Sequence, residues 1–147
     1  MSLSNIFDDI IGGMTKEEAF LAVLSAAVMI DGEKDGREAE ELEALTRRSR
    51  TLAALKPNEA AAFRAKIEPR LTKDKINELV SDACASLKQE KPDVALSLLA
   101  HCCDIIFADQ HVRTEERTFL QALIAALAIP EQDAEMILRA LKIKNAH

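Results

Sequence analysis

The chain has 147 residues, close to the commonest size of one domain, and we treat residues 1–147 as a single domain. Hydrophobic residues make up 48% of it and charged residues 30%, which is typical of a globular protein. The formal net charge of −6 argues against nucleic acid as a partner. With five Phe and no Tyr or Trp, the core must consist mainly of Leu, Ile, Val and Ala, which favours packed helices over a β-sandwich.

Cysteine usage and the start of the chain predict a cytoplasmic protein. The three cysteines are an odd number and two are adjacent, so they do not fit a disulfide framework. Residues 2–13 include two aspartates and no basic start, unlike a signal peptide. The apolar run at 19–30 is shorter than the roughly 20 residues that a membrane-spanning helix needs. We therefore expect no insertion into a membrane.

The first predicted helix opens with a capping box. Thr15 and Glu18 have the spacing at which each side chain accepts a hydrogen bond from the other residue's backbone N–H. The residues that follow are apolar nearly all round the helix up to Ile30, which predicts a central, buried helix. An acidic loop with two glycines follows at 31–36. A charged amphipathic helix then extends from about 37 to 54.

The next segment is also predicted to be helical. Pro57 marks a break, and a third helix covers about 59–71, where Pro69 disturbs it. Thr72 is the candidate N-cap of a fourth helix, whose apolar residues recur at helical spacing up to Leu87.

The second half begins with Pro92 near the first position of a fifth helix, over 93–108, where the missing N–H costs nothing. The apolar surface of this helix is continuous, so it is the second buried helix. A loop at 109–113 follows, and Thr114 is expected to cap a sixth helix. After a further proline, the last helix covers 133–142. No segment alternates with period two, so the fold class is all-α, a compact bundle of six or seven helices.

An internal repeat is the most informative feature of the chain. Asp31 and Glu38 recur as Asp109 and Glu116, both at an offset of 78 residues, and five Leu and Ala positions match at the same offset. Each half then contains a buried helix, an acidic loop and an amphipathic helix. We expect the halves to be pseudo-symmetric and to pack about a two-fold axis. The domain divides into an N-terminal segment (1–13), repeat one (about 15–56), linker helices (about 57–91) and repeat two (about 92–143).

The repeated acids are the candidate metal ligands: Asp31, Glu38, Asp109 and Glu116. If the two halves pack face to face, these four carboxylates converge, and they repel one another unless a cation or protons intervene. Carboxylate oxygens suit a hard divalent cation. A histidine nearby shifts the preference towards a transition ion. The possible auxiliary ligands are Glu33, Asp35 and His111.

The acidic loops also have a purely structural explanation. Asp31 and the acids two and four residues after it resemble the start of an EF-hand, but the twelfth position is Leu42 where a bidentate Glu is required. The loop is therefore not an EF-hand. An Asp-Gly turn and a Glu in a first helical turn are ordinary loop and capping chemistry that needs no metal.

Catalytic motifs are not found in the sequence. There is no Gly-rich phosphate loop, no metalloprotease motif and no nucleophile elbow, so we predict no enzymatic activity and no small-molecule substrate. Cys84, Cys102 and Cys103 lack the spacing of zinc ligands and are expected to be small buried hydrophobic residues.

The residues around the two acidic loops resemble the signature of the TerB-like tellurite-resistance family. The first copy is the stretch at 27–33 with Glu38, and the second is the stretch at 105–109 with Glu116; the resemblance covers about residues 15–140. It implies an all-helical bacterial domain of two pseudo-symmetric halves, active in stress responses, whose acidic positions are proposed to chelate metal. Such domains also occur in DnaJ-type co-chaperones.

This chain departs from the family pattern near both loops. Gln110 stands where Gly is usual, Lys34 replaces an apolar residue, and Arg113 lies beside the second acidic position. The cationic side chains at 34 and 113 offer another way to neutralise the acids. Two functions thus remain open: a non-enzymatic stress-response domain that binds a divalent cation, and a helical interaction module, with a protein partner or as a homodimer, in which the acids serve as caps.

Overall fold

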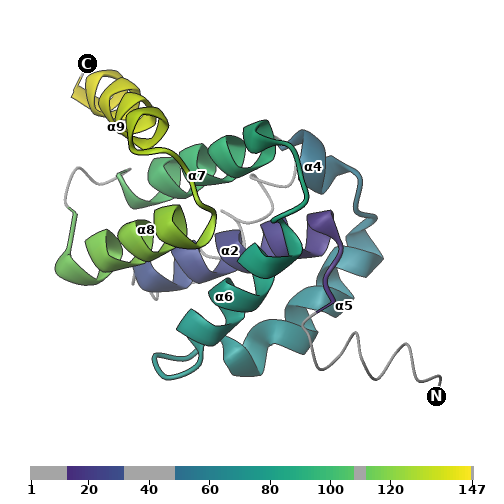
Figure 1. The fold of residues 1–147 in the computed structure, drawn as a ribbon. Helices are drawn as coiled ribbons and strands as arrows, with labels where there is room; N and C mark the ends of the chain where they lie inside the picture. Colours follow the sequence, from purple (N-terminus) through teal and green to yellow (C-terminus); the bar gives the residue numbers. More distant parts are fainter. Residues whose placement is uncertain (1–12, 32–48, 108–111, 147) are drawn as a thin grey trace.

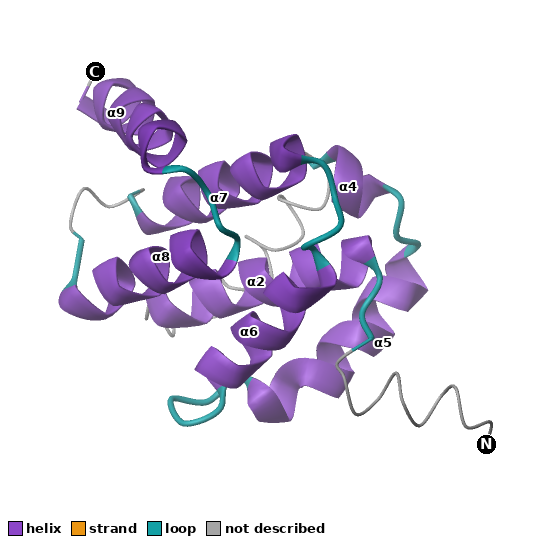
Figure 2. Ribbon diagram, viewed as in Figure 1, coloured by secondary structure: helices purple, strands orange, loops and turns teal. Residues whose placement is uncertain are grey.

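A computed structural model describes residues 13–31, 49–107 and 112–146 of the chain. These residues form seven α-helices and one 3₁₀-helix, with no strand among them, so the predicted all-α class is confirmed (Figure 2). The pseudo-two-fold axis stays a prediction. The helices are α2 (Lys16–Asp31), α4 (Arg50–Ala53), α5 (Pro57–Ile67), η1 (Glu68–Arg70), α6 (Ile76–Ser86), α7 (Pro92–Ile106), α8 (Thr114–Ala126) and α9 (Glu131–Ala146).

Helix α2 is the centre of the bundle, as its composition predicts. The capping box forms: Thr15 N donates to Glu18 Oε1 at 3.0 Å, and Glu18 N donates to Thr15 Oγ1 at 3.1 Å. Every side chain from Ala19 to Val28 is buried. One of them is polar, and its hydroxyl donates to the carbonyl of Leu21 at 2.8 Å. Because α2 is apolar all round, it contacts α4, α5, α6, α7 and α8 (Figure 1).

Helix α7 is the second buried helix. It begins at Pro92, which occupies the first helical position. It contacts α2, α8 and α9. In Figure 1, α2 and α7 both run from right to left, so their C-terminal ends lie on the same side of the molecule, where α8 begins. The buried residues of α7 are Leu98, Leu99, Cys102, Cys103, Ile105 and Ile106.

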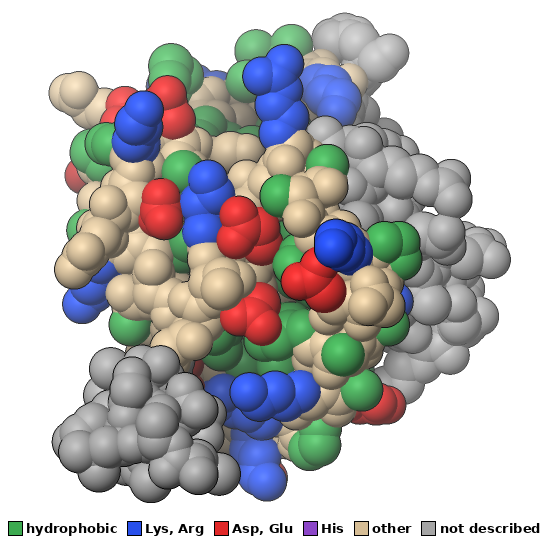
Figure 3. Space-filling model, turned by 90° about the vertical axis from the view of Figure 1, so that its right-hand side faces the viewer, with side chains coloured by type: hydrophobic (Ala, Val, Ile, Leu, Met, Phe, Trp, Pro, Cys, Tyr) green, Lys and Arg blue, Asp and Glu red, His purple; other side chains and the backbone are tan. Residues whose placement is uncertain are grey.

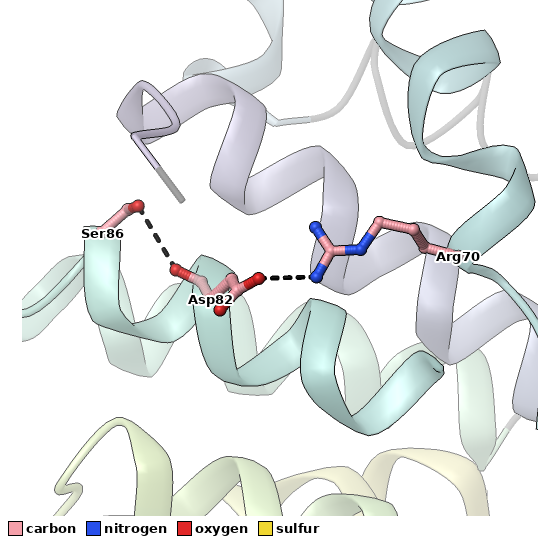
Figure 4. A network of polar contacts seen from close by, with 3 residues as sticks. All are labelled: Arg70, Asp82 and Ser86. Carbon is pink, nitrogen blue, oxygen red and sulfur yellow. Dashed lines mark hydrogen bonds and ion pairs between the residues drawn. The ribbon is translucent and has the colours of Figure 1, made fainter. Parts of the chain in front are cut away.

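The linker between the buried helices is helical, as expected. Pro57 is the first residue of α5, and Pro69 lies in η1, where the helix gives way to a 3₁₀ turn because proline cannot donate a backbone hydrogen bond. Arg70 at the end of η1 forms a salt bridge with Asp82 of α6, at 2.6 Å between Nη2 and Oδ2 (Figure 4). This ion pair joins the linker's turn to the helix that follows it.

The prediction of one charged helix over 37–54 is wrong at Ser49, where the chain is not helical. Ser49 has an extended backbone (φ −85°, ψ 125°), and its hydroxyl accepts a hydrogen bond from Leu52 N at 3.3 Å. Ser49 is therefore the N-cap of a separate helix, α4, and no continuous helix passes through it. Residues 37–48 lie outside the part of the chain that is described.

Two predicted threonine caps are also wrong. Helix α6 begins at Ile76, and Thr72 contributes its backbone carbonyl, which accepts from Ile76 N at 2.9 Å. In α8, Thr114 is the first helical residue, and Arg113 is the N-cap, with an extended backbone (φ −78°, ψ 162°). The cap forms one residue early because the side chain at Glu116 reaches back to the N–H of Arg113.

The turn from α8 into α9 is a Schellman motif with alanine in the position that glycine usually occupies. Ala128 has φ 53°, its N–H donates to Ala125 O at 3.1 Å, and Ile129 N donates to Ile124 O at 3.1 Å. Helix α9 then extends from residue 131 to 146, longer than the predicted 133–142. It lies against α7 and diverges from α8 after the turn (Figure 1).

Candidate functional site

The predicted metal ligands are only partly described. Asp31 is the last residue of α2, but nothing is described of its side chain. Glu38 and Asp109 lie outside the described residues, as do the three auxiliary candidates, Glu33, Asp35 and His111. The convergence of the four carboxylates therefore stays a prediction, and Glu116 is the one whose surroundings can be stated.

Glu116 is a fully buried carboxylate. It lies in the first turn of α8, its exposed fraction is 0%, and its Oε1 accepts a hydrogen bond from Arg113 N at 3.0 Å. A carboxylate removed from water costs free energy that hydrogen bonds, opposite charges or a cation must offset. The capping role that the sequence left open for this residue is thus realised, and the depth of its burial goes beyond what capping requires.

The capping box at the start of α2 shows that a cap of this type does not require a buried glutamate. Glu18 makes the same hydrogen bond, to Thr15 N at the same 3.0 Å, yet this pair lies at the protein surface. The cap alone does not need a buried side chain. Glu116 is buried because α8 packs against α2, α6 and α7, which places its first turn in the interior.

The ends of the two buried helices provide the electrostatic setting. The C-terminus of a helix carries about half a negative charge, from backbone carbonyls without partners. Helices α2 and α7 contact each other, and both end on the side of the molecule where α8 begins (Figure 1). Neither has a basic residue in its last turn. The negative potential of the two helix ends is thus not offset by a basic residue in either last turn.

The three cysteines are part of the buried core. Cys84, Cys102 and Cys103 are buried and unbridged, as predicted. Burial raises the pKa of Cys84 to about 11 and that of Cys103 to about 12, and it raises the pKa of Cys102 well above its ordinary value. Thiols held in the neutral form are poor metal ligands. No group of three His, Cys, Asp or Glu residues suited to a metal occurs within the three described segments.

A pocket between α8 and α9 is the feature that sequence reasoning missed. Its volume is about 850 Å³, and it is partly open to solvent. The faint signal in the sequence is the spacing along one face of α8, where two arginines are followed by apolar residues at positions 120 and 124. It is lined by Phe107, Val112, Arg113, Thr114, Arg117, Leu120, Gln121, Ile124, Leu138 and Lys142.

On the face that Figure 3 shows, several Lys or Arg side chains lie together near the lower edge, while the middle carries both charges. There, acidic and basic side chains are interspersed with small apolar patches.

Comparison with known proteins identifies the family. The model of the family described as tellurite resistance protein TerB matches residues 17–139. The chain belongs to this family. The match covers α7, all but the first residue of α2, and both acidic loops of this TerB member, which confirms the family that the sequence resembles. No curated protein and no solved structure matches the chain. None of the helices in the described segments has the length and apolar character to cross a membrane.

Proposed function

We propose that this TerB member is a non-enzymatic stress-response domain that binds one divalent cation between its two acidic junctions. The ligands are the carboxylates of Asp31, Glu38, Asp109 and Glu116. Four oxygen donors of this kind suit a hard cation such as Ca²⁺, Mg²⁺ or Mn²⁺. Tellurite is an oxyanion and is repelled by such a cluster, so any role in resistance to it is indirect.

The observation that carries the proposal is the common side at which α2 and α7 end. Asp31 is the last residue of α2, and the loop that contains Asp109 follows α7 directly. Helix α8, which contains Glu116, contacts both of these helices. Three of the four acids are therefore attached to helix ends that lie on one side of the bundle (Figure 1). Two helix C-termini at this place add negative potential to that of the acids.

Burial of Glu116 is the second support. The donor set contains at least one carboxylate that the fold keeps away from solvent. Metal ions in proteins favour such sites, because a low effective dielectric strengthens the attraction between ligand and ion. Its hydrogen bond from Arg113 N fixes the carboxylate's orientation, as outer partners of metal ligands commonly do.

Thermal unfolding with and without metal tests the proposal. A cation at one hundred times its dissociation constant should stabilise the fold by about 2.7 kcal/mol, because it binds the native state alone. Asp31→Asn together with Asp109→Asn should remove this gain. Identical melting curves in Ca²⁺, Mg²⁺, Mn²⁺ and a chelator would exclude the cation site.

Glu116→Gln separates metal binding from capping. Glutamine keeps an oxygen that accepts from Arg113 N but loses the charge, so the cap survives and the ligand is weakened. Glu18→Gln is the matched control, because it makes the same change in the same type of cap at the far end of α2. We expect the first variant to lose most of the metal-dependent shift and the second to keep it. Equal shifts in both variants would remove Glu116 from the ligand set.

A second function, a protein interaction module without metal, is favoured by one observation. Helix α9 exposes two large apolar side chains, Met136 at 62% and Ile143 at 66%, spaced two turns apart. Apolar residues that recur in this way on an exposed helix are typical of a contact with another helix. Light scattering after size exclusion should then show a dimer that Met136→Lys dissociates. If the wild type and the Met136→Lys variant were both monomers with the same elution volume, the interaction-module function would be contradicted.

A further inference from the structure

Helix α9 has apolar side chains on two opposite faces. Its inner face contains Ala134 and Leu141, which are buried, and α9 contacts α7 at the edge of the molecule (Figure 1). At about 100° per residue, Met136, Ala140 and Ile143 lie on the opposite, outer face, and all three are exposed. A helix with apolar residues on both faces is typical of one that is covered on both sides. The outer face of α9 is therefore a candidate surface for a second molecule.

A shallow hollow on this outer face has the lining that a packed helix requires. Its volume is about 340 Å³, and all its lining residues belong to α9: Gln132, Glu135, Met136 and Arg139. Their positions are i, i+3, i+4 and i+7, the four residues that surround an inserted side chain when two helices pack side by side. An apolar side chain from another helix can therefore enter the hollow.

The charges of α9 favour a second copy of the same helix. Acidic residues are confined to its first part and basic residues to its last part: Glu131, Asp133 and Glu135, then Arg139, Lys142 and Lys144. Two copies packed antiparallel place the acidic part of each against the basic part of the other, whereas two parallel copies oppose like charges. The dipoles of two neighbouring helices also favour the antiparallel arrangement.

One antiparallel register satisfies both the hollow and the charges. With Ile143 of one copy level with Met136 of the other, two-fold symmetry places an isoleucine in the hollow of each copy. In this register Lys142 of one copy lies on the same flank as Glu135 of the other, about 3 Å from it along the helix axis. Glu135 already pairs with Arg139 of its own helix at 3.1 Å, but both side chains are mostly exposed, so the carboxylate can accept a second cation.

We propose that two copies of this chain associate through the outer faces of α9, packed antiparallel, with Ile143 of each copy in the hollow of the other. The proposal names the partner for the interaction-module function described above, on which it rests, and does not involve the cation site. One pair of helices forms a small interface, so we expect a dissociation constant in the roughly micromolar range.

Disulfide cross-linking tests the orientation of the two helices. The variants Met136→Cys and Ile143→Cys are prepared separately and then mixed. The native cysteines are buried, so the introduced thiols are the reactive ones. We expect the mixture to form a disulfide between the two variants faster than either variant forms one with itself. Faster cross-linking of each variant with itself would show a parallel pair and overturn the proposal, as would the absence of any cross-link.

Sedimentation equilibrium tests the charge pairing. Glu135→Lys opposes like charges across the interface and should raise the dissociation constant about fivefold or more. Adding Lys142→Glu restores opposite charges and should return the constant to within about twofold of the wild type. Glu90→Lys makes the same change at an exposed position before α7 and is the control, with no effect expected.

The outcomes separate this proposal from the functions on which the previous subsection concluded. A wild type that is monomeric at every concentration would contradict both the antiparallel pair and a homodimeric interaction module. A dimer that is insensitive to the exchange of charges would overturn the antiparallel pair alone. Binding of another protein or of lipid vesicles through α9, without self-association, would overturn the second copy as the partner. The metal-dependent melting shift should be the same in Glu135→Lys as in the wild type, so the cation site is tested independently.

Discussion

Replacing Ala128 by Gly should stabilise the protein, because this alanine has the backbone conformation of a Schellman glycine. Its φ of 53° brings the Cβ close to the backbone, which costs about 1–2 kcal/mol for a residue other than glycine. Glycine removes this strain but loses more conformational entropy on folding, about 0.5–1 kcal/mol. The net gain is about 0.5–1 kcal/mol, or a rise in melting temperature of about 2–3 °C for a chain of this length.

The assay is thermal unfolding followed by circular dichroism, with urea unfolding as a second measure. Ala122→Gly is the matched control, because Ala122 is exposed within the same helix and glycine there should destabilise by about 1 kcal/mol. The same chemical change should thus destabilise the protein at Ala122, within α8, and stabilise it at Ala128, six residues later and just beyond the end of the helix. A lower melting temperature for Ala128→Gly would refute the reasoning from backbone strain.

Three further predictions concern the core, the thiols and the linker. Leu99→Ala should lower the free energy of unfolding by about 3 kcal/mol, because Leu99 is fully buried, and a loss below about 1 kcal/mol in urea unfolding would contradict this. Burial raises the pKa of Cys84 to about 11 and of Cys103 to about 12, so the neutral thiols contribute stability that is complete below about pH 9 and is lost as pH rises towards these values. The urea midpoint should therefore be lower at pH 10 than at pH 8 in the wild type, and the difference should be smaller after Cys84→Ala. The same difference in both proteins would exclude thiol ionisation as its cause. Asp82→Asn should cost only about 0.2–1 kcal/mol, since its ion pair with Arg70 is about one-third exposed, and the loss should shrink in high salt.

Local signals predicted the elements that depend on neighbouring residues. The capping box of Thr15 and Glu18 forms because its two partners are three residues apart and need no tertiary contact. Pro92 begins α7 because its ring sets φ in advance. The burial of α2 follows from apolar residues on every side of the helix, since no orientation of such a helix exposes a polar face.

Other boundaries were missed where a weak preference met a stronger contact. A threonine N-cap is worth about 1 kcal/mol, and in α8 the side chain of Glu116 shifts the cap to Arg113 instead. The break at Ser49 could not be inferred from propensity, because the residues before it are also good helix formers.

The candidate sites depend on contacts that a single sequence does not encode locally. The repeat supplied the residue types of the cation site, but whether Asp31 and Asp109 meet depends on the packing of helices 78 residues apart. The burial of Glu116 likewise follows from how α8 lies against α2 and α7. The pocket between α8 and α9 arises from the angle at which α9 leaves α8, and no pattern of residues along either helix fixes that angle.

A crystal grown with Mn²⁺ and measured for anomalous scattering tests the central claim most directly. The cation-site proposal predicts one strong manganese peak per chain, contacted by carboxylate oxygens of Asp31, Glu38, Asp109 and Glu116. The carboxyl groups of Asp31 and Asp109 should then lie within about 8 Å of each other, close enough for one ion or a bridging water to serve both. Carboxyl groups on separate faces of the bundle, with no peak between them, would contradict it.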